Sequence, residues 1–302
     1  MNCPAIGPIS DARGARPVRM NAPIRLSRSR GFTLIEVIIV IVITGVIAAV
    51  VAIFIPKPVQ GYFDSVRRAQ LTDSADLALR RIARDIQTAL PNSIRSGDAN
   101  NYFLEFLPVR SGGRYRSSPD SGDPLDLTSP SLDTSFDVLG PVVSVAAGDS
   151  IVIYNTGQSG ANAYDCDNRR PEAASGAALA TIVFSVAAAA PCTGQFPRDS
   201  PSRIFQVVST PVTYACDAAN GVLWRFSGYL IQSGQPATIG SAPLVSGARL
   251  ANNVVCQSSG TDLGTGFVVR NADGLVGLRI HLRDANGEEV RLYREVHVDN
   301  TP

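Results

Sequence analysis

The feature that most constrains this chain is an apolar run at 32–55, in which Glu36 is the only charged residue. About 20 apolar residues suffice to cross a bilayer as a helix, and at about 1.5 Å per residue this run would reach roughly 36 Å. A carboxylate inside such a helix costs about 2.5–3.5 kcal/mol on insertion scales and is a functional candidate by default. The run therefore predicts a membrane helix in which Glu36 serves a purpose beyond anchoring.

The segment before this run, residues 1–31, is basic, with six Arg and one Asp. Arg-rich flanks stay in the cytoplasm, so the chain beyond the helix is expected in the periplasm. A secretory signal peptide fits poorly, because its cleavage site follows a shorter apolar core, whereas here the junction Gly31–Phe32 precedes the run. We interpret 1–31 as a leader that is removed, with Met20 as an alternative start. An uncleaved signal anchor is the other interpretation.

The hexapeptide at 31–36, Gly-Phe-Thr-Leu-Ile-Glu, followed by the unbroken apolar run, resembles the signal of type IV prepilins and type II secretion pseudopilins. The resemblance implies that prepilin peptidase cuts after Gly31 and methylates the new N-terminal Phe32. It also implies, as partners, other major and minor pilins of a filament and an inner-membrane assembly platform. Glu36 would neutralise the α-amino group of a neighbouring Phe32, a pairing that is stronger in a low dielectric than in water.

The choice among subunits depends on length and on a further resemblance. After removal of the leader 271 residues remain, more than is usual for a major pilin. Segments at 59–65, 69–73, 78–86 and 90–93 resemble the MshO-like minor pilins of mannose-sensitive haemagglutinin (MSHA) pilus systems. This resemblance implies a minor pilin that acts in pilus assembly or at the tip.

Three alternatives remain open. A J-type minor pseudopilin of a type II secretion system shares the helix plan. A membrane-anchored periplasmic enzyme or binding domain would carry the junction by coincidence. A tip adhesin, which is compatible with the pilin interpretation, would bind a surface ligand through the loops expected at 110–135 and 156–175.

Residues 56–91 predict an amphipathic continuation of the helix. Pro56 and Pro58 predict a kink or break where the chain leaves the bilayer, and Pro91 is expected to stop the helix. Charged residues cover the other face, with i,i+4 pairs at Asp76–Arg80 and Arg81–Asp85. Apolar residues recur at spacings of three and four, as one buried stripe requires: Leu71, Ala75, Ala78, Leu79, Ile82, Ala83, Ile86, Ala89 and Leu90.

Beyond this helix the pattern changes to strands, and we expect one periplasmic β-rich domain over 92–302. Asn220-Gly221, Asp273-Gly274 and Asn286-Gly287 are strong hairpin signals. The segment 250–255 fits a short helix or a strand. Strands are expected at 102–109, 136–145, 150–154, 177–187, 202–208, 211–216, 221–231, 266–270, 274–283 and 288–298. The predicted fold class is α+β, a long N-terminal helix packed on an antiparallel sheet in a pilin-like arrangement.

Four of the five Cys follow the apolar run, in a compartment where disulfides persist. Four Cys allow three pairings. We favour Cys166–Cys192, which bracket one expected strand, and Cys216–Cys256, at the edges of the C-terminal sheet. In the entropy model a bridge closing about 40 residues stabilises by roughly 3–4 kcal/mol. The Cys spacing lacks Cys-x-x-Cys and has no nearby His, which argues against zinc.

The sequence contains no recognisable catalytic motif, so we expect no enzyme activity, no catalytic residues and no cofactor. His281 and His297 are expected at exposed strand positions with structural roles. Acidic residues flank two cysteines, but acidic turns are common and we expect no metal. The chain after residue 31 carries 21 basic and 25 acidic residues, a net charge of −4, which gives no electrostatic argument for nucleic acid.

Overall fold

The structure is a computed structural model that describes residues 31–54, 56–97, 102–128, 131–187, 192–256, 264–270 and 274–298. The chain divides into two compact units, Met1–Val59 and Gln60–Pro302. The first unit contains helix α1 (Leu34–Phe54), whose residues are all exposed. Helix α2 (Pro56–Ile86) begins within the first unit and continues into the second. The element order, long helices followed by strands, confirms the predicted α+β class.

In the second unit, α2 buries the apolar stripe that the sequence predicts. Its buried residues are Leu71, Ala75, Ala78, Leu79, Ile82, Ala83 and Ile86. The helix ends at Ile86, short of the expected stop at Pro91, because the next residues pair with a strand instead. Leu90 N donates to Leu107 O at 2.7 Å, and Val109 N donates to Thr88 O at 2.8 Å. These tertiary hydrogen bonds replace one further turn of helix.

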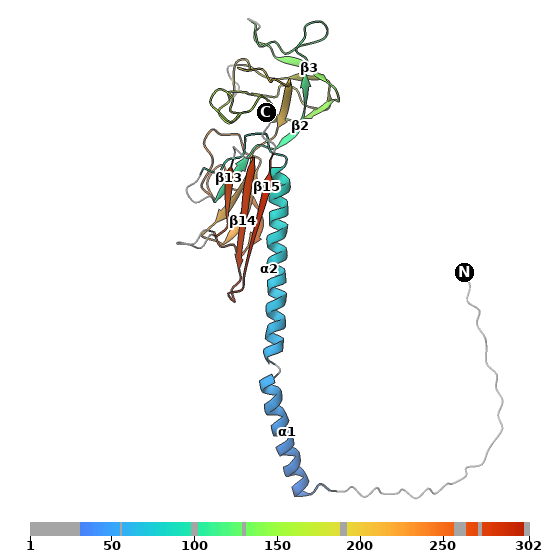
Figure 1. The fold of residues 1–302 in the computed structure, drawn as a ribbon, viewed down its shortest axis with the longest axis vertical. Helices are drawn as coiled ribbons and strands as arrows, with labels where there is room; N and C mark the ends of the chain where they lie inside the picture. The colour runs from blue at the N-terminus through green and yellow to red at the C-terminus, as the bar shows by residue number, and fades with distance from the viewer. Residues whose placement is uncertain are drawn as a thin grey trace, which may run out of the picture. The chain divides into compact units, whose positions relative to one another are not determined.

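Two antiparallel sheets share a core with α2, and Figure 1 shows β13–β15 alongside the helix. The four-stranded sheet has the order β1-β10-β11-β12, with β1 (Phe103–Phe106), β10 (Val212–Asp217), β11 (Val222–Ser227) and β12 (Gly247–Asn252). The three-stranded sheet has the order β13-β14-β15, with β13 (Gly266–Arg270), β14 (Leu275–Arg283) and β15 (Glu289–His297). We call α2 from Gln60 onward together with these seven strands the helix–sheet lobe.

The hairpins of this lobe agree with their turn signals. Strands β10 and β11 pair across Gly221, which has φ of 62°. Strands β14 and β15 pair through nine residue pairs, with Gly287 at φ of 86° in their turn. Backbone of this kind favours glycine because it has no Cβ. In the segment 250–255, for which helix and strand remained open, residues 250–252 lie in strand β12.

Between β1 and β10 the chain makes a second lobe, the barrel lobe (residues 109–208). Its main sheet has the order β6-β5-β9-β2-β3-β8. The two edge strands also meet, since Ala173 N donates to Val183 O at 3.0 Å and Ser185 N donates to Pro171 O at 2.9 Å. The sheet therefore closes on itself. Its strands are β2 (Val109–Tyr115), β3 (Ser135–Leu139), β5 (Ser150–Ile153), β6 (Arg169–Pro171), β8 (Thr181–Val183) and β9 (Ile204–Val208), with β4 (Val143–Val145) and β7 (Gly176–Leu179) as a separate pair.

The closed sheet surrounds an aromatic core of its own. Phe136 lies 5.0 Å from Phe205 and 5.8 Å from Tyr115, measured between ring centroids. Phe184 is 5.0 Å from Phe196 in the same way. All five side chains are almost fully buried. The barrel lobe therefore has a hydrophobic core separate from the core around α2.

The expected loop at 110–135 was wrong over its first part, because β2 runs through it as far as Tyr115. Its Ser-Gly-Gly sequence resembles a loop, but the glycines permit close approach to β9. A Cβ on Gly112 would lie 2.8 Å from Phe205 O, and a Cβ on Gly113 would lie 3.3 Å from the Phe205 ring. Likewise, the expected loop at 156–175 contains the short strand β6.

Candidate processing and assembly site

The N-terminus of α1 is built around Thr33, which caps the helix. Thr33 Oγ1 accepts a hydrogen bond from Glu36 N at 3.3 Å, and Thr33 O accepts from the N–H groups of Glu36 and Val37 at 3.1 and 3.2 Å. Thr and Glu at this spacing form the sequence of a capping box. We did not single out Thr33 from the sequence, although the Thr-x-x-Glu pattern was available to find it.

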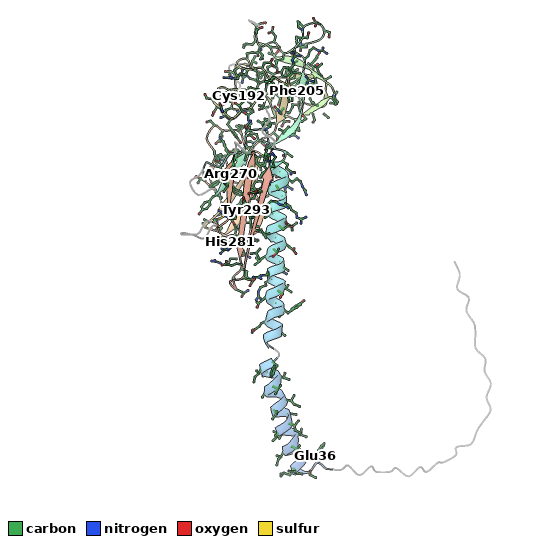
Figure 2. All side chains as sticks on the ribbon, in the orientation of Figure 1. Glu36, Cys192, Phe205, Arg270, His281 and Tyr293 are labelled. Carbon is green, nitrogen blue, oxygen red and sulfur yellow. A yellow bond between two sulfur atoms is a disulfide. The ribbon has the colours of Figure 1, made fainter. Side chains whose placement is uncertain are left out.

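Phe32 and Glu36 lie close together at the start of this helix. Both line one shallow groove with Val37, Val40 and Ile41. Phe32 is 79% exposed, and a Cβ added to Gly31 would have open space around it. Figure 2 shows Glu36 at the beginning of α1. The junction is therefore accessible, and the carboxylate shares a groove with the residue that would become the new N-terminus.

The rest of α1 is apolar and exposed, and its hydroxyl is satisfied within the helix. Thr44 Oγ1 donates to Val40 O at 2.6 Å, which removes its need for water. Among the described residues, one helical span, which starts at Leu34 and contains α1, is long and apolar enough to cross a membrane. This helix fits an inner-membrane anchor.

Two disulfides are present, with the pairing favoured from the sequence. Cys166 is bonded to Cys192 in the barrel lobe, and Cys216 is bonded to Cys256 in the helix–sheet lobe. The second bridge links β10 to the segment after β12 and lies in the core against α2. Each disulfide therefore links two segments of a single lobe.

The two histidines differ, and the exposed position expected for His281 was wrong. His297 is exposed, but His281 is fully buried, and its Nε2 lies 3.2 Å from Glu289 Oε2. Thr265 Oγ1 accepts from His281 N at 2.9 Å. Glu289 and Arg291 on the paired strand contact the ring, on a sheet face that the alternating pattern predicted to be exposed.

The acidic residues near the cysteines act within turns. Asp217 Oδ1 accepts from the N–H groups of Ala219 and Asn220, both at 3.1 Å. Asp167 Oδ2 accepts from Gly160 N at 2.7 Å. Across the residues that the structure describes, no three His, Cys, Asp or Glu side chains are grouped as a metal site would require.

A buried ionic network joins the two lobes, and the sequence did not reveal it. Glu105 is fully buried; its Oε2 accepts from Arg95 at 2.8 Å and its Oε1 accepts from Tyr229 at 2.9 Å. Burial raises the pKa of the Glu105 carboxyl, and Arg95 opposes this shift. The Arg95 guanidinium also lies 3.6 Å from the ring centroid of Tyr164 in the barrel lobe, whose hydroxyl donates to Ser93 O.

Residues 26–52 match the family model described as the prokaryotic N-terminal methylation motif. The match covers the leader junction and most of α1. Comparison with curated proteins and with solved structures gives no match. The motif supports a type IV pilin-like prepilin, that is, a pilin or pseudopilin subunit. It implies processing by prepilin peptidase and assembly with other pilins, and it indicates a structural subunit rather than an enzyme.

Proposed function

We propose that this chain is a minor pilin-like subunit of a type IV pilus of the MSHA type. Residues 1–31 are a cytoplasmic leader that prepilin peptidase removes after Gly31, and Phe32 is then methylated. Residues 32–55 anchor the subunit in the inner membrane before assembly, and 56–91 continue the helix. Residues 92–302 lie in the periplasm and reach the filament surface or tip after assembly.

The observation that best supports a minor rather than a major pilin is the barrel lobe. The helix–sheet lobe is complete without it, because β1 pairs with β10 on either side of the insertion. Every copy in a helical shaft must fit between its neighbours. An additional closed sheet is accommodated more easily where a subunit occurs in few copies, as at a tip. The two disulfides suit a protein exposed outside the cytoplasm.

The proposed role of Glu36 follows from the groove at the start of α1. Cleavage after Gly31 creates an α-amino group at Phe32, and an isolated charge among apolar helices is costly. Glu36 of one subunit neutralises the amino group of the next, which sets the axial register on entry into the filament. The capped first turn holds the Glu36 backbone in place.

The test compares Glu36→Ala with Val37→Ala, a control in the same helical turn. We expect Glu36→Ala to be cleaved at the wild-type rate, because the junction is unchanged, but to enter filaments at least about tenfold less often. Val37→Ala should enter normally. Immunoblots of membranes and sheared filaments measure both steps. Wild-type incorporation of Glu36→Ala would contradict the assembly role.

The J-type minor pseudopilin is the second candidate, because the N-terminal motif occurs in both classes. Deletion of the gene separates them. Loss of surface piliation with normal protein secretion supports the pilus subunit. The reverse result supports the pseudopilin.

A further inference from the structure

A pocket lies between the barrel lobe and the segments that come just before β10 and just after β11. The barrel lobe contributes Ser150, Arg169 and Pro171, and the other wall contains Thr210, Leu230 and Ile231. These six residues bring together one cation, two hydroxyls and an apolar surface. Nothing in the pilin-like role of α1 uses these residues.

Arg169 is the unusual member of this lining. Its side chain belongs to a residue only 5% exposed, yet its hydrogen bonds go to neutral acceptors. Nε donates to Ala163 O at 2.8 Å, and Nη2 lies 3.1 Å from Cys166 Sγ, a weak acceptor. Nη1 has a long contact of 3.5 Å with Ser150 Oγ, which also lines the pocket. Within the described residues, Arg169 forms no ion pair with a carboxylate.

The neighbouring Arg170 shows what a satisfied buried guanidinium looks like in the same strand. It donates to five backbone carbonyls, at Cys166, Asp167, Arg169, Gly194 and Gln195. It also lies 5.1 Å from the ring centroid of Phe196. Arg170 therefore has a complete structural role. Arg169 has fewer and weaker bonds, and burial together with Arg170 lowers its pKa to about 10.

Two carboxylates also line the pocket; Asp149 is paired with a cation, and Glu172 accepts one backbone hydrogen bond. Asp149 is held by Arg110 through contacts of 2.6 and 3.3 Å and accepts from Ala146 N at 2.8 Å. Glu172 Oε1 accepts from Gly148 N at 2.9 Å. They leave the charge of Arg169 uncompensated, but they would repel a ligand with two negative charges. Among anions, the pocket therefore favours one that carries a single negative charge.

The rim is apolar and open to solvent. Leu230 is 83% exposed beside Pro171 and Ile231, which also line the pocket. An aliphatic group placed here would remove apolar surface from water, which is favourable in proportion to its area.

We propose that this pocket binds a small monocarboxylate with an aliphatic body. The carboxylate accepts hydrogen bonds from Arg169 Nη1 and from the hydroxyls of Ser150 and Thr210, and the aliphatic part packs on Pro171, Leu230 and Ile231. Charge-assisted bonds of this kind are the strong ones. The proposal stands apart from the pilin-like function, because it uses none of the α1 residues.

The test uses the full chain in lipid nanodiscs, with saturation-transfer NMR to observe ligand binding and empty nanodiscs subtracted. The probe is hexanoate; hexanamide is the neutral control of the same length, and inorganic phosphate is the control for charge. We expect saturation of hexanoate but not of hexanamide or phosphate. N-acetyl-leucine and its amide form a second pair, which tells whether a protein C-terminus can supply the carboxylate.

Three variants assign the site. Arg169→Gln should weaken hexanoate at least about tenfold, and Thr210→Val and Leu230→Ser should weaken it about threefold to fivefold. Leu139→Ser, at an exposed leucine elsewhere in the barrel lobe, is the matched control and should bind as wild type. If Arg169→Gln unfolds the barrel lobe, the binding of hexanoate by Thr210→Val and Leu230→Ser decides whether this pocket is the site. Absence of hexanoate binding, equal binding of hexanamide, or wild-type binding by those two variants would overturn the proposal.

Discussion

At the residue scale, Asp85 connects α2 to the four-stranded sheet. Its Oδ2 accepts from Tyr214 Oη and from Arg225 Nε, both at 2.8 Å, while Oδ1 lies 3.1 Å from Arg81 Nε. The sequence indicates only the pair with Arg81, because helical spacing is a local property. The two sheet partners lie far along the chain. A residue on the charged face of the helix thus helps to hold the helix on the sheet.

Replacement of Asp85 tests this connection. Asp85→Ala leaves Tyr214 and Arg225 without their acceptor, and hydrogen bonds to charged groups contribute about 1.5–3 kcal/mol. We expect the free energy of unfolding to fall by about 2 kcal/mol. Asp76→Ala, which removes the exposed pair with Arg80, should cost less than about 0.5 kcal/mol. Urea unfolding of the full chain in detergent measures both; equal effects would contradict the role of Asp85.

The buried Glu105 leads us to expect that the stability of the fold depends on pH. Burial raises the pKa of Glu105 in the folded state above its ordinary value of 4.5. Between the ordinary pKa and this raised pKa, the folded state binds the proton more tightly than the unfolded state does. Stability from this group is therefore present below about pH 4.5 and is lost as pH rises through the folded pKa.

The variant Glu105→Gln cannot titrate, and it removes this contribution. We expect its free energy of unfolding, relative to wild type, to improve as pH rises from 4 to 7. Chemical denaturation at several pH values measures the difference. Glu295→Gln, at an exposed position, is the control and should show no such trend. A difference that worsens with rising pH would contradict the raised pKa.

At the element scale, β2 illustrates why some strands escape sequence analysis. Alternating apolar residues made β14 recognisable, whereas the Ser-Gly-Gly of β2 resembles a loop. The glycines of β2 matter because of Phe205 on β9, a contact between residues about ninety positions apart that local patterns do not contain. The amphipathic stripe of α2 and the Asn-Gly turns are local properties, and the sequence predicted them well.

A glycine substitution tests the close approach in the barrel lobe. A Cβ on Gly112 would lie 2.8 Å from a backbone oxygen, so β2 or β9 must shift in Gly112→Ala. We expect a loss of about 1–3 kcal/mol, as for other overpacked sites. Gly234→Ala, where a Cβ would have nothing within 4 Å, should be close to neutral. Thermal unfolding compares the two, and a neutral Gly112→Ala would show that the strands are not tightly apposed.

At the scale of the whole molecule, the insertion of the barrel lobe into the helix–sheet lobe could not be predicted from the sequence. The helix–sheet lobe could be predicted as α+β from its helix and tail hairpins. The barrel lobe could not, because its closure depends on hydrogen bonds between edge strands, such as Ser185 N to Pro171 O. The candidate processing residues could be proposed from the sequence, since Gly31, Phe32 and Glu36 form a local motif, whereas the burial of Arg169 and Glu105 depends on tertiary packing.

The insertion predicts that the barrel lobe can be removed. Its two ends meet, since Ser209 N donates to Pro108 O at 3.0 Å. We expect a chain in which a short Asn-Gly turn replaces residues 109–208 to fold, although less stably, because contacts between the lobes are lost. It should retain the Cys216–Cys256 bridge and cleavage after Gly31. Non-reducing peptide mapping and protease resistance measure this; complete unfolding would contradict an independent helix–sheet lobe.

The central claim is that the chain is cut after Gly31 and enters a filament through its N-terminal helix. Mass spectrometry of the N-terminus in purified filaments tests this most directly. The claim predicts a peptide that begins at methylated Phe32 and is present in low copy relative to the major subunit. A chain that retains residues before Gly31 and remains in the inner membrane would contradict it.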